Sequence, residues 1–303
     1  MNKERSRKIS KQTWGEWSWG WFLIAPTIIG LVVLNIIPII QTAYLSLFKS
    51  GDFGRGNIYV GLENYRKMFS DAQVWHAVGN TLLYALLVVP LSIAISLVVA
   101  VFLNGNIRGK TIYRTIYFIP MVAAPAAVTM VWRWLYNEHF GLINYVLSRI
   151  GIDAVDWVGS PKLSLISIAI IGIWSVIGYN MVLLLAGLQE IPKDFYEASD
   201  IDGASRIRQF FVITLPLLSP TLFFVVVTSI IQAMQVFDVI YMMIDVMSPA
   251  YEHTVSLVYL FYNNSFKYSN KGYGSAIVML LLAIIMVITF IQMRAQKKWV
   301  NYM

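Results

Sequence analysis

The sequence contains no cysteine among its 303 residues. Disulfide frameworks, cysteine nucleophiles and thiolate metal sites are therefore excluded, because each of them needs this residue. The three histidines, His76, His139 and His253, are far apart in the chain and match no ligand spacing such as H-E-x-x-H. The sequence therefore predicts no metal site.

Charged side chains are also scarce. They make up 13% of the residues, against about a quarter in soluble globular proteins. Apolar residues make up 58%, and the mean hydropathy is +0.64. A disordered chain needs the opposite balance, with low hydrophobicity and high charge. The composition indicates a membrane protein, provided that the apolar residues are grouped into spans.

The apolar residues do form such spans. A helix needs about 20 apolar residues to cross a hydrocarbon core about 30 Å thick. Lipid offers no partners to unpaired backbone groups, so each span must be helical. We predict an all-α, polytopic protein with six transmembrane helices at about 19–45, 77–103, 111–135, 163–188, 212–237 and 274–293. Pro90 in the second span, and Pro120 and Pro125 in the third, predict bent helices.

Basic residues set the predicted orientation. The segment before the first span concentrates them, at Lys3, Arg5, Arg7, Lys8 and Lys11. Positive residues favour the cytoplasmic side, so both termini are expected there. The net charge of +7 follows from this topology, and no folded basic patch indicates nucleic-acid binding. The predicted regions are a tail at 1–18, a first helix at 19–45, an irregular extracytoplasmic loop at 46–75, a five-helix core at 76–296 with a cytoplasmic loop at 189–212, and a tail at 297–303.

Four of the six spans contain no Asp, Glu, Lys or Arg: 77–103, 163–188, 212–237 and 274–293. Proton- and ion-coupled carriers usually keep ionisable residues at membrane depth. A secondary solute carrier therefore remains an alternative function, but the absence of such residues argues against it. No credible selectivity filter indicates a channel. The uncharged spans favour a neutral solute.

Neutral polar and aromatic side chains are candidates for lining a solute pathway. Thr228, Gln232 and Gln235 share one face of the fifth span, at spacing i, i+4, i+7. Amides bind hydroxyl groups, and aromatic faces pack on sugar C–H groups. Hydrogen bonding between helices is the competing interpretation. The middle of the fourth span adds Trp174, Tyr179 and Asn180.

The loop between the fourth and fifth spans differs from the others. Pro192 predicts the start of a short helix and Gly203 predicts its end. This helix is too short to cross a bilayer and too acidic to attract anionic lipid. Docking into a groove of a cytoplasmic partner protein is therefore favoured over an ordinary interfacial helix. The acidic residues are Asp194, Glu197 and Asp200, and the apolar ones are Phe195, Ala198 and Ile201.

This loop resembles the EAA loop of ATP-binding-cassette importer permeases. Glu197-Ala198-Ser199 is followed after three residues by Gly203, and after nine more by Ile213-x-Leu215-Pro216. The form is similar to the sugar branch of these permeases, which includes the maltose and lactose types. Further segments agree with that branch, and together they cover about residues 20–295: Arg114–Pro120, Gly141–Asn144, Ala186–Gln189, Val236–Tyr241 and Gly272–Ala276.

The resemblance implies a type I importer permease fold and a non-catalytic subunit in a prokaryotic inner membrane. It implies a second permease, two cytoplasmic ATPase subunits that bind ATP in place of this chain, an extracytoplasmic solute-binding protein and a sugar substrate, which the uncharged spans indicate is neutral. This chain then needs no cofactor of its own. The ATPase-coupling residues it implies are Asp194, Glu197, Ala198, Asp202, Gly203 and Ala204, and Asp238 completes the substrate-lining candidates.

Two positions depart from the family pattern. Ser199 stands where a second alanine is usual, a small change that should keep the helix surface. Residues 247–249 are Met-Ser-Pro where many relatives have Gly-Gly-Pro, so the shape of that outer loop is not predicted.

Overall fold

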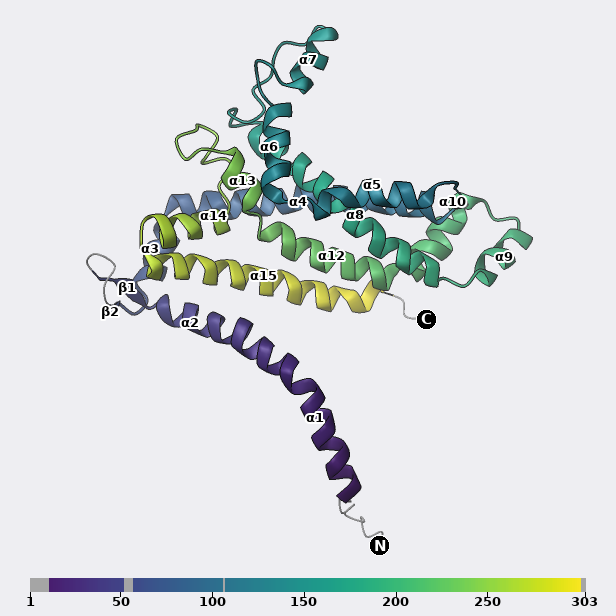
Figure 1. Ribbon diagram of the computed structural model, residues 1–303, viewed down its shortest axis with the longest axis horizontal. Helices are drawn as coiled ribbons and strands as arrows, with labels where there is room; N and C mark the ends of the chain where they lie inside the picture. The colour runs from purple at the N-terminus through teal and green to yellow at the C-terminus, as the bar shows by residue number, and fades with distance from the viewer. Residues whose placement is uncertain (1–10, 52–56, 106, 301–303) are drawn as a thin grey trace.

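Long helices dominate the computed structural model, which describes residues 11–51, 57–105 and 107–300 (Figure 1). Their length and unbroken hydropathy explain why they form, since a backbone without water must satisfy its own hydrogen bonds. The long apolar helices are α1 (Lys11–Leu31), which continues through a π-helical turn (Val32–Ile36) into α2 (Ile37–Leu45), α4 (Ala72–Asn104), α8 (Ser164–Glu190), α12 (Ser219–Met234) and α15 (Lys271–Trp299).

Shorter helices join them. These are α3 (Glu63–Ser70), α5 (Lys110–Val122), α6 (Pro125–Leu135), α7 (Leu142–Arg149), α9 (Asp194–Ile201), α10 (Arg206–Gln209), α11 (Leu215–Leu217), α13 (Asp238–Met243) and α14 (Leu257–Tyr262), with π-helical turns at Phe210–Thr214 and Asn263–Lys267.

Five of the six predicted spans are confirmed as helices long and apolar enough to cross a membrane. Pro90 lies inside the continuous 33-residue helix α4, so the predicted bend does not interrupt that helix. Pro216 and Pro220 do interrupt the start of the fifth span, where short helical segments precede the long run of α12. The predictions for residues 1–10 and 301–303 concern segments outside the described residues.

The third predicted span, 111–135, is not one straight crossing. It is divided into α5 and α6, which meet at an angle of 98°. The break lies at Ala123 and Ala124, both in extended conformation, and Pro125 begins α6. A residue before proline is biased away from the helical region, and proline cannot donate back to the preceding turn. The span is therefore bent at Pro125 as predicted, whereas Pro120 lies inside α5, and the bend is sharp enough to make it a broken span or a re-entrant pair.

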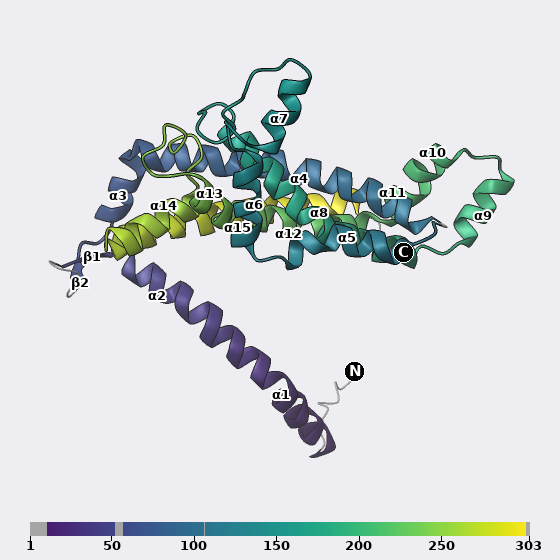
Figure 2. The same cartoon turned by 45° about the horizontal axis from the view of Figure 1, so that its top comes forward.

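The first helix stands apart from the bundle in both views (Figures 1 and 2). None of its most apolar stretch is buried within the chain, and only α2 packs closely on another long helix, α15. Trp19 is 67% exposed and Leu34 is 74% exposed. This helix accordingly presents an apolar surface to lipid or to another protein.

The loop predicted to be irregular, 46–75, contains an antiparallel hairpin and a helix. β1 (Phe48–Ser50) pairs with β2 (Asn57–Tyr59), with Phe48 opposite Tyr59, and α3 follows. Buried Asn64 of α3 donates to the backbone oxygens of Ser46 and Phe48, at 2.8 Å each. An amide that bonds two carbonyls fixes the hairpin to α3, a local contact that composition does not reveal.

Asp71 joins the starts of two long helices at this hairpin end of the bundle. Its Oδ1 accepts a bond from the backbone N–H of Gln73, capping α4, at 2.9 Å. Its Oδ2 accepts a bond from the hydroxyl of Tyr273, in the first turn of α15, at 2.6 Å. Lys67 of α3 lies 4.8 Å from the ring centroid of the same tyrosine. The starts of α4 and α15 are therefore tied together.

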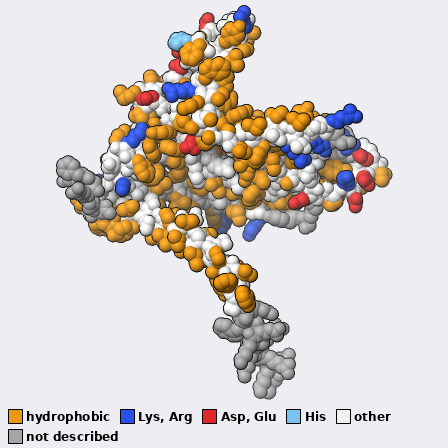
Figure 3. Space-filling view, viewed as in Figure 1, with side chains coloured by type: hydrophobic (Ala, Val, Ile, Leu, Met, Phe, Trp, Pro, Cys, Tyr) orange, Lys and Arg blue, Asp and Glu red, His pale blue; other side chains and the backbone are white. Residues whose placement is uncertain are grey.

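The buried core lies mainly between α4 and α8, with α12 and α5 packed on them. Gly178 of α8 allows a close approach to α5, because a Cβ there would lie 1.9 Å from the backbone oxygen of Tyr117 in α5. Small residues of this kind let membrane helices pack tightly. Hydrophobic side chains cover the sides of the bundle and the first helix, and acidic and basic side chains gather at the end formed by α9 and α10 (Figure 3).

Candidate translocation cavity and coupling loop

A cavity of about 150 Å³ lies between α4, α8 and α12. Its polar lining comes from one amide, Gln232, and from the hydroxyl-bearing residues Tyr84, Ser92, Ser175 and Ser229. No Asp, Glu, Lys or Arg lines it. Amide and hydroxyl groups both donate and accept hydrogen bonds, so this cavity suits an uncharged, hydroxylated molecule.

The three residues predicted to share a face of the fifth span differ in their surroundings. Gln232 lines the cavity. The Thr228 hydroxyl donates to the backbone oxygen of Phe224 in its own helix at 2.9 Å. Gln235 caps the C-terminus of α12 and is exposed, and it does not line the cavity. The structure therefore brings only Gln232 of this group into the cavity.

Asn180 of α8 is buried and makes a contact between helices. Its Oδ1 accepts a bond from Ser229 of α12 at 3.4 Å, and its Nδ2 has no partner within the described structure. The Asn180 oxygen therefore takes part in hydrogen bonding between helices, which was the interpretation competing with a role in lining the pathway. Its N–H₂ group stays available to bind a solute.

The other predicted lining residues lie outside this cavity. Trp174 is 40% exposed, with its ring 5.8 Å from that of Trp132. Tyr179 is half-buried on α8. Asp238 is exposed in the first turn of α13, where a carboxylate is favoured by the helix dipole.

The short helix predicted within the loop 189–212 is present as α9, and it exposes apolar side chains. Ile201 is 87% exposed and Phe195 is 47% exposed. Exposed large apolar residues beside a polar rim mark protein interaction surfaces. Asp194 and Glu197 lie in the first turn, next to the positive end of the helix dipole, and Ala198 is exposed beside them.

Gly203 ends α9 as predicted, with a φ of +71°. Asp202 caps the helix. The N–H of Gly203 donates to the oxygen of Asp200 at 3.1 Å, and the N–H of Ala204 donates to that of Ser199 at 3.0 Å. These two bonds form a Schellman motif, which needs a residue that adopts positive φ without strain.

The comparisons with known proteins agree with this architecture. The family model described as binding-protein-dependent transport system inner membrane component matches residues 92–301. The chain belongs to this family.

Two curated relatives extend the match to almost the whole chain. The permease is 33% identical over 285 residues to the trehalose/maltose transport system permease protein MalF of Thermococcus litoralis, covering 94% of this chain and 96% of that protein. It is 36% identical over 286 residues to the sn-glycerol-3-phosphate transport system permease protein UgpA of Brucella abortus, covering 93% and 96%. The protein is thus a non-catalytic membrane subunit of a sugar-type ABC importer.

A solved structure has the same fold. The crystal structure of a bacterial alginate ABC transporter, in complex with a periplasmic protein that holds an alginate pentasaccharide, contains a chain that superimposes with a TM-score of 0.81. The identity is 21%, and the match covers 97% of this permease and 98% of that chain. The fold of a type I importer permease is therefore established for this protein.

Two links between α9 and the rest of the permease were not predicted from the sequence. The first uses Gln209, which donates from its Nε2 to Oδ1 of Asp200 at 2.5 Å. The second joins the hydroxyl groups of Tyr196 and Thr214 at 2.9 Å. The sequence shows only a glutamine within the loop 189–212, and its burial becomes evident once the fold brings the two helices together.

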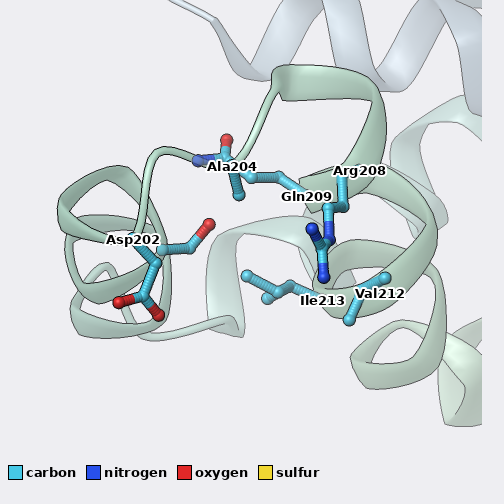
Figure 4. A pocket seen from close by; sticks show the side chains of 7 residues that line it. Asp202, Ala204, Arg208, Gln209, Val212 and Ile213 are labelled. Atoms are coloured by element: carbon cyan, nitrogen blue, oxygen red, sulfur yellow. The ribbon is translucent and has the colours of Figure 1, made fainter.

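These links border a hollow of about 290 Å³ between α9 and the segment 208–213. Figure 4 shows Gln209 reaching across toward α9, with Arg208, Val212 and Ile213 facing Asp202 over the hollow. Ser199 also lines it, and the Ser199 hydroxyl is buried without a partner in the described structure. Alanine, the usual residue at this position of the family motif, would remove that unpaired group.

A group of aromatic rings lies where α13 and α14 meet, and it too was not predicted. The rings of Phe237 and Tyr241 stack with centroids 5.1 Å apart, and Tyr262 lies 5.1 Å from each. The ammonium of Lys267 lies 5.2 Å from the centroid of the Tyr241 ring. Burial raises the pKa of the neighbouring Tyr259 to about 12, so its hydroxyl stays protonated.

Proposed function

We propose that this permease forms one half of the translocation pathway for a neutral sugar or oligosaccharide. The observation that supports this substrate class best is the cavity of about 150 Å³, whose polar groups are one amide and several hydroxyls and which no charged residue lines. A phosphate or carboxylate at this position would lose its hydration without gaining a cation, which costs several kcal/mol per ion.

A second permease completes the membrane unit in this proposal. The first helix supports it, because none of its most apolar stretch is buried in this chain and it leans away from the bundle (Figure 2). A partner permease would cover that helix, and the two chains together would enclose the pathway.

Two cytoplasmic ATPase subunits bind the ATP, and α9 docks on them as the coupling helix. The exposed Ile201 and Phe195 beside Asp194 and Glu197 support this assignment. Both termini are cytoplasmic, as the basic N-terminal segment favours. An extracytoplasmic solute-binding protein delivers the sugar, as expected for a member of a binding-protein-dependent transport family.

The test is a transport assay on the complete complex in vesicles, with its cognate solute-binding protein and a panel of solutes. We expect ATP-dependent uptake of a neutral sugar such as trehalose or maltose, and none of glycerol 3-phosphate or an acidic oligosaccharide. Uptake of only the charged solutes would overturn the substrate class. Uphill uptake by this chain alone would overturn the dependence on partner subunits and revive the secondary carrier.

A further inference from the structure

We propose that Gln209 and Tyr196 are positioning residues that lock the coupling helix α9 to the segment leading into α12. This inference rests on the proposed coupling role of α9. The two side chains would make α9 and the start of α12 move as one unit when the ATPase subunits move.

The first reason is that α9 has little other support. It makes no broad packing contact with another element of the described chain. Figure 1 shows it at the end of the bundle, reached by loops on both sides. Phe195, Ala198 and Ile201 are exposed and therefore do not anchor it. Tyr196 is the large apolar side chain of α9 that packs against the core. A helix held only by its connecting loops would tilt under load without moving the spans.

The second reason is the burial of the Gln209 side chain, which is 3% exposed in a segment where most neighbours are exposed. Its Nε2 donates to Asp200 at 2.5 Å, and its Oε1 accepts a bond from Arg206 at 3.3 Å. The Arg206–Asp200 ion pair alone is weak, at 3.9 Å with both side chains more than half exposed. The amide therefore provides the defined link between α9 and α10.

The third reason is that the second link reaches the same segment from another side. The Tyr196 hydroxyl bonds that of Thr214, and the Thr214 hydroxyl also lies 3.4 Å from the backbone oxygen of Gln209. Thr214 is buried at the end of the π-helical turn that leads to α11 and α12. Tyr196 also lines a hollow of about 390 Å³ together with Asn104 and Leu188, at the ends of α4 and α8. Two bonds at separate points of α9 restrict its rotation as well as its translation.

The hollow of about 290 Å³ sharpens this inference. Where two elements pack fully, apolar contact holds them, and a single hydrogen bond adds little. Here the surfaces stand apart, and Gln209 crosses the gap between them (Figure 4). The relative position of α9 and α10 therefore depends on specific polar bonds.

The test compares imported solute per ATP hydrolysed in complexes that contain permease variants. In the double variant Tyr196→Phe/Gln209→Leu, both bonds are lost while the side-chain volumes stay close to those of the original residues. We expect the ATPase subunits to co-purify in normal amounts, and the solute imported per ATP to fall about tenfold, since each lost bond favours undocked arrangements of α9. Tyr113→Phe/Gln73→Leu is the matched control, because it makes the same two substitutions at exposed positions that take part in neither bond; its ratio should stay within about twofold of the original.

Reversible cross-linking separates positioning from a general structural defect. The chain contains no native cysteine, so Asp200→Cys/Gln209→Cys supplies its only two thiols. We expect low coupling in the reduced state, recovery after a short bis-methanethiosulfonate reagent bridges the thiols, and loss again after reduction. A merely misfolded variant would not recover in this way.

The outcomes distinguish this inference from the proposed function. If Glu197→Lys abolishes uptake while the double variant imports normally per ATP, the lock is overturned and the coupling role stands. If Glu197→Lys also imports normally, the coupling role of α9 falls and the lock falls with it. Failure of the cross-link to restore coupling would overturn the positioning role as well.

Discussion

At the scale of single residues, the sequence shows which side chains can bind a sugar, but only the structure shows which of them line the cavity. The sequence identified Thr228, Gln232 and Gln235 as one polar face, since helical periodicity places them together. It could not reveal that α12 ends at Met234, or that the Thr228 hydroxyl bonds its own backbone. Both facts depend on the local path of the chain. Gln232 is thus the member of this group that is placed to meet a solute.

Replacing Gln232 by alanine should weaken transport. The loss of one hydrogen bond to a sugar hydroxyl should raise the KM for uptake about two- to tenfold, because such a bond is worth about 0.5–1.5 kcal/mol. Uptake kinetics of the assembled complex measure this. Gln235→Ala is the matched comparison, since it removes the same amide outside the cavity, and a smaller effect is expected. Equal KM values for Gln232→Ala and the original protein would exclude Gln232 from the lining.

Gly203 offers a second test at this scale. A side chain there meets nothing within 4 Å, so only its backbone conformation resists substitution. Gly203→Val should strain the turn by about 1–2 kcal/mol and reduce uptake, whereas Gly203→Asn should retain most of it because asparagine tolerates positive φ. Uptake and ATPase co-purification measure both variants. Equal uptake by the two would contradict a role for the Schellman turn.

At the scale of elements, the sequence predicted where the helices lie better than it predicted the angles between them. Hydropathy located the long helices, and prolines in the third span predicted a bend. The angle of 98° between α5 and α6 was not predictable, because it depends on packing against other helices after Ala123 and Ala124 leave the helical conformation. The hairpin in 46–75 was missed because strands of three residues give almost no periodic signal.

The acidic first turn of α9 gives a prediction for that element. Glu197→Lys should abolish uptake while membrane insertion stays normal. Reversing a charge near a helix N-terminus costs only about 0.3–1 kcal/mol, too little to unfold α9, so a complete loss would report a broken contact with the ATPase. Vesicle uptake and insertion measure the two properties. Glu190→Lys, at the end of α8, is the control and should import normally.

At the scale of the whole molecule, the bundle and the first helix are separate parts of one subunit. The bundle has a buried core of its own between α4 and α8, whereas the first helix has none. Sequence patterns placed the bundle and the first helix in the membrane. They could not show that the first helix leaves its most apolar stretch uncovered by the rest of the described chain. That distinction needs the positions of all the helices.

Thiol labelling tests this arrangement. Ile29 is 61% exposed on the first helix, so Ile29→Cys should react with a lipophilic maleimide when this chain is expressed alone. Co-expression of the second permease should slow that reaction about tenfold or more, by covering the helix. Ile58→Cys on the hairpin, 58% exposed in the original, should react equally in both cases. Unchanged labelling at position 29 would contradict contact with a partner permease.

The shared carboxylate of Asp71 has a mechanical consequence. It fastens the first turns of α4 and α15, so the starts of these two helices are held together at the hairpin end, while α4 packs on α8 and α12 along its length. At 1.5 Å per residue, the 33 residues of α4 give a lever arm of about 50 Å. A rotation of the helix by about 5° around the Asp71 end would displace its far tip by about 4 Å.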